Sequence, residues 1–142
     1  MEITKMEKAD AAELSELDKV CFAVPWSEKS FKDEAENPLA KYFVAKDKGK
    51  IVGYGGIWLV ADEGQITNIA VLPTMRRCGI ASAILEQLLL QAPDMPVVLE
   101  VRKSNDAAIL LYEKYGFSKV GERKNFYHSP VENAIIMMRG ET

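Results

Sequence analysis

Residues 68–82 read Asn-Ile-Ala-Val-Leu-Pro-Thr-Met-Arg-Arg-Cys-Gly-Ile-Ala-Ser. The apolar run Ile69 to Val71 predicts a strand, which Pro73 ends because proline has no N–H to donate to a strand ladder. The stretch therefore predicts a strand, a loop with two arginines, and a helix that begins near Gly79. The helix is predicted by apolar residues at the three-and-four spacing of an amphipathic helix, namely Ile80, Ile84, Leu85, Leu88 and Leu89.

The predicted start of this helix has the chemistry of an anion site. The first backbone N–H groups of a helix have no intrahelical partner, and the aligned peptide dipoles place partial positive charge there. Gly79 and Ala81 are small enough for a pyrophosphate to approach the backbone, and Arg76 and Arg77 could neutralise its charge. An ordinary strand-loop-helix connection with solvated arginines fits the spacing equally well.

Composition limits the classes of protein to which the chain can belong. With 142 residues, of which 48% are hydrophobic, it suits one domain spanning residues 1–142. A net charge of -3 gives no global attraction to nucleic acid or to an anionic membrane. Two cysteines and one histidine cannot form a four-ligand zinc site alone, so we expect no metal. The N-terminus has no apolar leader and no run reaches membrane-spanning length, so we expect a cytoplasmic protein.

The rest of the chain alternates strand and helix patterns and predicts a single α/β domain with a mixed sheet. Cys21 is expected in the core, and Gly55-Gly56 within a strand indicates a bulge or a close backbone approach. The almost wholly apolar strand at 97–101 is expected to be buried on both faces. We expect strands at 2–6, 42–45, 51–60, 63–71, 97–101, 117–123 and 134–139, and helices at 10–21, 27–37, 80–92 and 105–115.

Two residues stand out against this apolar background. Glu100 lies within Val97-Val98-Leu99-Glu100-Val101, where an ionised carboxylate is costly to bury without a partner. It either pairs with a cation such as Arg102 or holds its proton more tightly and serves as a base. Tyr112, in the next helix, could donate a proton to a leaving group. A salt-bridged carboxylate and a core-packed ring are the structural alternatives.

Several motifs together resemble a known family. The segment Arg76-Arg77-Cys78-Gly79-Ile80-Ala81 resembles the R/Q-x-x-G-x-G/A acyl-CoA signature of the GCN5-related N-acetyltransferase (GNAT) superfamily. Its position after a strand and at the start of a helix also fits. Further motifs are similar to the bacterial ribosomal-protein alanine N-acetyltransferase family, namely Leu99-Glu100-Val101-Arg102-Lys103-Ser104-Asn105, Leu111-Tyr112-Glu113-Lys114-Tyr115-Gly116-Phe117, Pro25-Trp26-Ser27-Glu28 and Glu132-Asn133-Ala134-Ile135-Ile136-Met137.

The resemblance implies a fold, a co-substrate and roles for the matching residues. The fold would be a mixed, mostly antiparallel sheet flanked by helices, and the co-substrate would be acetyl-CoA, without a metal. Glu100 would be the general base and Tyr112 the general acid. The strand residues Ile69, Ala70 and Val71 would hold the pantetheine arm and acetyl carbonyl. The pyrophosphate and the rest of the co-substrate would be bound by Arg76, Arg77, Cys78, Gly79, Ile80, Ala81, Ser82 and Asn105.

Three other reactive side chains have simpler interpretations. Cys78 occupies a variable position of the signature, and the matched family uses no nucleophile there. His128 lies in a polar, aromatic loop and is interpreted as surface. Tyr115 is an alternative to Tyr112 as the acid, but its place beside Gly116-Phe117 favours packing.

The resemblance implies that the acceptor is a protein N-terminus, with the N-terminal alanine of a small-subunit ribosomal protein as the first expectation. Trp26, Phe126 and Tyr127 could form the walls of a cleft for its leading residues. The net acidity of the chain is compatible with a basic ribosomal tail. We expect a monomer that contacts neither nucleic acid nor membrane. The alternatives are acetylation of a small-molecule amine and a non-catalytic module that binds acetyl-CoA.

Overall fold

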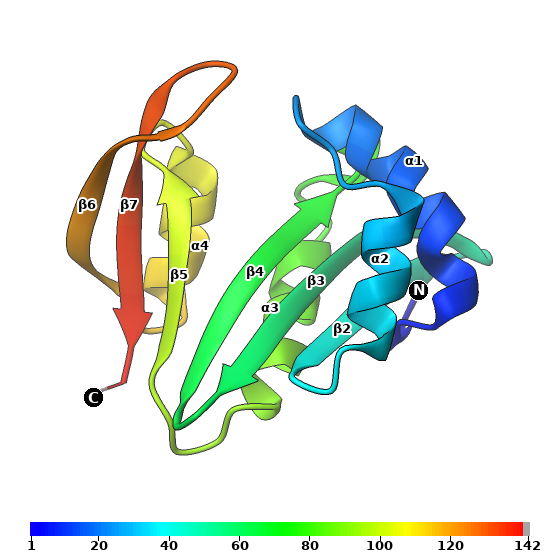
Figure 1. Ribbon diagram of the computed structural model, residues 1–142, viewed down its shortest axis with the longest axis horizontal. Coiled ribbons are helices and arrows are strands. Elements are labelled where there is room, and N and C mark those ends of the chain that lie inside the picture. The colour runs from blue at the N-terminus through cyan, green and yellow to red at the C-terminus, as the bar shows by residue number, and fades with distance from the viewer. Residues whose placement is uncertain (141–142) are drawn as a thin grey trace.

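The computed structural model describes residues 1–140, and the last two positions of the expected domain lie outside the described residues. Seven strands form one sheet in the order β1-β2-β3-β4-β5-β7-β6 (Figure 1). The strands are β1 (Glu2–Lys5), β2 (Ala40–Asp47), β3 (Lys50–Val60), β4 (Glu63–Val71), β5 (Val97–Arg102), β6 (Ser118–Tyr127) and β7 (Glu132–Arg139). The helices are α1 (Ala11–Cys21), α2 (Glu28–Glu36), α3 (Ile80–Leu90) and α4 (Asp106–Lys114).

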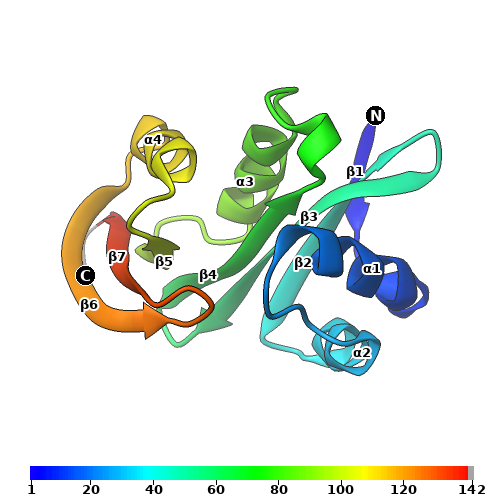
Figure 2. The ribbon, with the colours of Figure 1, turned by 90° about the horizontal axis from the view of Figure 1, so that it is seen from above.

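The helices cover both faces of the sheet. In Figure 2, α1 and α2 lie on one face and α3 and α4 lie on the other. Each pair of helices buries its own cluster of side chains against the strands. Leu14, Leu17 and Phe31 belong to the cluster under α1 and α2, whereas Ile84 and Leu88 belong to the cluster under α3. The mixed, mostly antiparallel sheet flanked by helices is therefore confirmed.

One pair of neighbouring strands is parallel, and it separates after a short contact. Strand β4 pairs with β5 only at Gly64↔Val97 and Gln65↔Val98, while every other neighbouring pair is antiparallel. Beyond this contact the two strands diverge (Figure 1), so their facing edges carry no strand partner. The opening lies at the carboxyl end of β4, where the chain enters the arginine loop and α3.

A bulge interrupts β4 at the mouth of this opening. Gly56 of β3 is opposite Asn68, and the next residue, Ile57, is opposite Ile66, so Thr67 is the extra residue. The glycines of β3 allow a close approach here, because a Cβ on Gly56 would overlap the ring of Tyr42. The bulge or close approach expected at Gly55-Gly56 is thus confirmed in both respects.

The structure corrects several expectations from the sequence. Strand β5 is not buried on both faces, because Glu100 is exposed and one face of the strand meets the opening. Val20, expected on the apolar side of α1, is 61% exposed. Strand β6 continues to Tyr127, through residues expected to form a loop. Among the described helices, none combines the length and apolar character needed to cross a bilayer.

Candidate functional site

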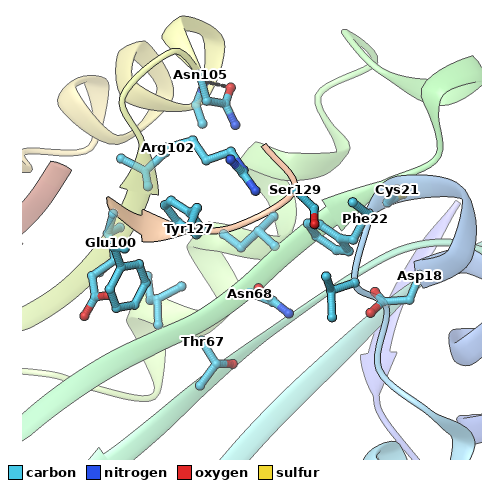
Figure 3. A pocket seen from close by; sticks show the side chains of 18 of the residues that line it. Asp18, Cys21, Phe22, Thr67, Asn68, Glu100, Arg102, Asn105, Tyr127 and Ser129 are labelled. Carbon is cyan, nitrogen blue, oxygen red and sulfur yellow. Dashed lines mark hydrogen bonds between the residues drawn. The ribbon is translucent and has the colours of Figure 1, made fainter. Parts of the chain in front are cut away.

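A cavity of about 520 Å³ occupies the space between the separated strands. Figure 3 shows side chains from β4, β5, the N-terminal helix and the β6–β7 connection that converge on it. The residues expected at the site that line this cavity are Trp26, Ile69, Glu100, Asn105, Tyr112, Phe126 and Tyr127. The separation of β4 from β5 therefore brings the expected acid, base and substrate residues together.

Glu100 faces the cavity from β5 as an exposed carboxylate. The expectation that it is buried in an apolar strand is wrong. It is not paired with Arg102 either, because the Arg102 guanidinium lies 3.2 Å from Glu132 instead. Within residues 1–140 Glu100 forms no ion pair, which leaves its oxygens available to a ligand in the cavity.

Tyr112 and Tyr127 approach the same cavity. Tyr112 is buried, and this burial raises its pKa to about 12, with a smaller contribution from Tyr127. Burial also raises the pKa of Tyr127, and the negative charge of Glu100 raises it further. Both phenols therefore stay protonated at neutral pH. A phenol that remains protonated can donate a hydrogen bond or a proton.

Tyr115 points away from this group. Its hydroxyl donates a hydrogen bond to Glu86 in α3, 3.0 Å away, and it lines a separate pocket between the carboxyl ends of α3 and α4. The geometry therefore favours Tyr112 over Tyr115 as the proton donor at the cavity.

Asn105 caps α4 at the edge of the cavity. Its Oδ1 accepts a hydrogen bond from the backbone N–H of Ala108, 3.2 Å away. No other hydrogen bond of its side chain joins it to the described residues, so its Nδ2 donors are available to a ligand. Asn105 can therefore cap α4 through Oδ1 and contact a ligand through Nδ2 at the same time.

The backbone of β4 presents alternate residues to the opening. The N–H of Leu72 donates to Val52 of β3, so the amides of Ile69 and Val71 face the opposite edge. Ala70, expected among the cofactor residues, has its amide on the β3 side and its side chain buried. The Val71 carbonyl already accepts a hydrogen bond from Arg76 Nε at 3.2 Å. Ile69 is the strand residue that best keeps both backbone groups available.

The arginine loop lies beside the cavity rather than in its wall. Gly79 is the N-cap of α3 with φ at 78°, and a Cβ there would meet no atom within 4 Å. Arg77 and Cys78 are exposed, and Arg77 also has a positive φ of 64°. The first turn of α3, Ile80 to Ser82, follows directly, and its N–H groups have no acceptor within the helix. This arrangement fits the expected anion site.

Substitution of Gly79 by alanine is expected to weaken acetyl-CoA binding more than it lowers stability. The positive φ should cost roughly 1 kcal/mol of unfolding free energy, because only glycine adopts it readily. The added methyl would stand in the open space above the first turn of α3. Calorimetric titration with acetyl-CoA and thermal unfolding measure the two effects. Equal affinity in G79A and wild type would exclude the loop as the pyrophosphate site.

Arg102 links β5 to the β6–β7 connection. Its guanidinium donates to the carbonyl oxygens of His128 and Pro130, each at 3.0 Å, and lies 4.5 Å from the centre of the Tyr127 ring. Together these contacts hold Tyr127 and His128 at the rim of the cavity. The sequence suggested Arg102 only as a partner of Glu100, because its actual partners are far away in the chain.

The cavity also contains residues that sequence reasoning missed or interpreted differently. Cys21, expected in the core, is half-buried and lines the cavity, as do Asp18, Phe22, Thr67 and Asn68 (Figure 3). A signal for Asp18 was available, because it lies on the same helical face as Leu14 and Cys21. A carboxylate on the buried face of a helix must find hydrogen-bond donors. Among residues 1–140, no cluster of potential ligands could hold a metal ion.

Comparison with known proteins agrees with this geometry. Residues 11–117 match the family described as Acetyltransferase (GNAT) family. The ribosomal protein bS18-alanine N-acetyltransferase of Haemophilus influenzae is 37% identical, over 95% of this chain and 95% of its own. The N-alpha-acetyltransferase RimI of Mycobacterium tuberculosis is 35% identical, over 96% and 90%. The crystal structure of the ribosomal-protein-S18-alanine N-acetyltransferase from Escherichia coli superimposes with a TM-score of 0.89 at 34% identity, over 97% and 92%.

These matches confirm both levels of the resemblance found in the sequence. The relatives are similar over nearly the whole of both chains, and the family match includes the β4–α3 segment and the helix that carries Tyr112. The chain therefore belongs to the acetyltransferase (GNAT) family, and it groups there with the ribosomal-protein alanine N-acetyltransferases.

Proposed function

We propose that this enzyme transfers the acetyl group of acetyl-CoA to the α-amino group of a protein that begins with alanine. The acceptor is proposed to be a small-subunit ribosomal protein, modified in the cytoplasm. One observation carries the proposal: the carboxylate of Glu100, without an ion-pair partner in residues 1–140, lies in the same cavity as the Tyr112 phenol. The names of the relatives support the choice of acceptor.

The open edge of β4 and the start of α3 suit an acyl-CoA. When bound, acetyl-CoA supplies an activated thioester and amides along its pantetheine arm. The backbone groups of Ile69 face the opening and are not engaged by β3. The anionic pyrophosphate would be bound at the first turn of α3, beside Arg77 and Gly79. The residues present therefore fit the co-substrate.

Glu100 has the chemistry of the base. An α-amino group has a pKa of about 8, so at neutral pH most of it is protonated and cannot attack a carbonyl. The Glu100 carboxylate accepts that proton, directly or through a water molecule. Its negative charge also attracts the ammonium group into the cavity. The neutral amine then attacks the carbonyl carbon directly, with no acyl group passing through the enzyme.

The β4 backbone and Tyr112 stabilise the negative charges that develop on the carbonyl oxygen and on the departing sulfur. Negative charge develops on the carbonyl oxygen, where an N–H group from the open edge of β4 would stabilise it. As the carbon–sulfur bond breaks, the Tyr112 hydroxyl gives its proton to the departing sulfur, and the proton that the nitrogen loses on becoming an amide returns through water to the Tyr112 oxygen. The high pKa of Tyr112 keeps that proton in place until the thiolate forms.

Aromatic side chains at the rim are proposed to bind the first residues of the acceptor. Trp26 comes from the α1–α2 connection, and Phe126 and Tyr127 come from the end of β6, so they line the cavity from separate elements. Phe126 and Tyr127 pack edge to face, with ring centres 5.1 Å apart. The backbone contacts of Arg102 fix this rim.

A peptide assay tests the proposed function. Synthetic peptides that begin with Ala-Arg, with Ser or with Gly would be incubated with acetyl-CoA and the enzyme, and products would be identified by tandem mass spectrometry. We expect one acetyl group on the α-amine, added fastest to the alanine peptide. The control is the same Ala-Arg peptide with lysines further along and a chemically blocked α-amine. We expect no acetyl group on its lysine side chains.

Two outcomes would contradict the proposal. Acetylation of the blocked peptide would mean that the enzyme modifies lysine side chains. If no peptide gains an acetyl group although acetyl-CoA binds, the acceptor is not a protein N-terminus.

A further inference from the structure

The bulge in β4 is held by two side-chain networks, one buried and one half-buried, that take no part in the chemistry proposed above. Thr67, the extra residue of the bulge, and the next residue, Asn68, both line the cavity. Each is connected through the hydroxyl group of a tyrosine to a carboxylate on an N-terminal helix. Figure 3 shows Thr67 and Asn68 on β4, with Asp18 of α1 to their right.

The first network runs from Asn68 through Tyr54 to Asp18. Asn68 Nδ2 donates a hydrogen bond to the Tyr54 hydroxyl oxygen at 3.3 Å, and that hydroxyl donates to Asp18 Oδ1 at 2.7 Å. The other carboxylate oxygen of Asp18 accepts from the backbone N–H of Trp26 at 2.8 Å. Tyr54 is fully buried and Asp18 is 1% exposed. This network joins the bulge to the α1–α2 connection on the opposite wall of the cavity.

The second network runs from Thr67 through Tyr42 to Glu34. The hydroxyl of Tyr42 donates to Glu34 Oε1 at 2.9 Å and lies 2.8 Å from Thr67 Oγ1. Because the Tyr42 proton is used toward Glu34, the Thr67 hydroxyl is the donor in that contact. The indole N–H of Trp58 donates to the same Glu34 oxygen at 2.8 Å. The close approach allowed by Gly56 seats the Tyr42 ring beside the bulge.

The carboxylates of both networks are costly to desolvate, since Asp18 is buried and Glu34 is half-buried. Neither Asp18 nor Glu34 forms an ion pair with a cation in residues 1–140, so neutral donors alone compensate Asp18 and Glu34. Burial raises the pKa of Asp18, which shows that its desolvation outweighs the help of those donors. Burial also raises the pKa of Tyr42 and of Tyr54, so both phenols remain protonated donors. Fully satisfied buried networks fix one geometry more firmly than apolar packing does.

We infer that Tyr42 and Tyr54 are positioning residues, which fix the β4 bulge and hence the backbone that faces the thioester. The bulge sets the direction of the strand just before Ile69, whose amide lies on the open edge. Loss of either phenol frees one bulge side chain and leaves the carboxylate of Asp18 or Glu34 short of a donor. The effect of this loss on the rate of acetyl transfer rests on the proposed function, whereas its effect on the geometry of the bulge does not.

The test compares Tyr42→Phe and Tyr54→Phe with wild type. Each variant removes only a hydroxyl, and we expect each to lower kcat on the order of tenfold, with KM for acetyl-CoA nearly unchanged. Hydrogen exchange measured by mass spectrometry, on the protein without ligands, should be faster at the amides of residues 66–70. Phe31→Leu is the matched control, since Phe31 packs 5.3 Å from Tyr54 in the same core without a hydrogen bond.

The control separates positioning from general stability. Phe31→Leu is expected to lower the melting temperature at least as much as either tyrosine variant, with kcat retained. If kcat falls in all three variants in proportion to melting temperature, the tyrosines contribute only packing and the inference is wrong. It is also wrong if exchange at residues 66–70 is unchanged in both tyrosine variants. If wild type acetylates no peptide but the exchange accelerates, the proposed function fails while the positioning role stands.

Discussion

Replacement of Glu100 by glutamine is expected to slow acetyl transfer about a hundredfold to ten-thousandfold while acetyl-CoA binds as before. An amide has nearly the same shape but cannot accept the ammonium proton. Glu100 is exposed to the cavity and forms no ion pair within residues 1–140, so the change should leave the fold intact. Mass spectrometry of the alanine peptide gives the rate, and calorimetry gives the affinity for acetyl-CoA.

The pH dependence of this variant provides a specific signature. Without a base, the reaction depends on amine that is already neutral, so the rate of E100Q should rise with pH toward the α-amino pKa of about 8. The deficit relative to wild type should therefore shrink on the alkaline side. Glu113→Gln, an exposed glutamate on α4 outside the cavity, is the matched control and should keep full activity. If E100Q retains more than half of the wild-type rate, the base is another group.

Removal of the Tyr112 hydroxyl by Tyr112→Phe should lower kcat about a hundredfold, with little change in KM for either substrate. Because burial raises the pKa of Tyr112 to about 12, its phenol stays protonated through the working pH range. We therefore expect no loss of the wild-type rate from Tyr112 ionisation below about pH 11. Steady-state kinetics from pH 6 to about pH 10 would measure both effects.

Tyr115→Phe is the matched control for this prediction. Tyr115 lies on the same helix end but donates to Glu86 on the far side, so its variant should keep kcat. The competing donor is Tyr127, which also lines the cavity and is affected by the Glu100 charge. If Tyr112→Phe is fully active and Tyr127→Phe is not, the proton comes from Tyr127.

Local patterns in the sequence were sufficient to predict the segment from β4 to α3. A strand ended by proline, a glycine at a helix start and apolar residues at helical spacing are all properties of neighbouring residues. The strand bounds Glu63–Val71 and the start of α3 at Ile80 agree with the structure. The helix expected at 105–115 is also confirmed, as α4, and the structure shows Asn105 as its N-cap, which accepts a hydrogen bond from Ala108.

The environment of Glu100 could not be predicted in this way. Its exposure results from the separation of β4 and β5, and that separation depends on how distant segments pair in the sheet. An apolar strand buried on both faces and one that opens onto a cavity have the same local pattern. The ion-pair partner of Arg102 could not be predicted from local sequence either, because Glu132 lies in a different strand. Roles of Glu100 and Tyr112 in catalysis remain predictions from the family resemblance.

The separated strands also have a consequence for the handling of the protein. Their facing edges between Ile66 and Val71 and beyond Val98 expose backbone donors and acceptors inside the sheet. Such edges invite the addition of an extended segment from another chain, which is a common route to aggregation. A ligand whose amides pair with these open strand edges would prevent such addition. Samples saturated with CoA should therefore tolerate concentration and heating better than ligand-free samples, by mass action and by protection of the edges.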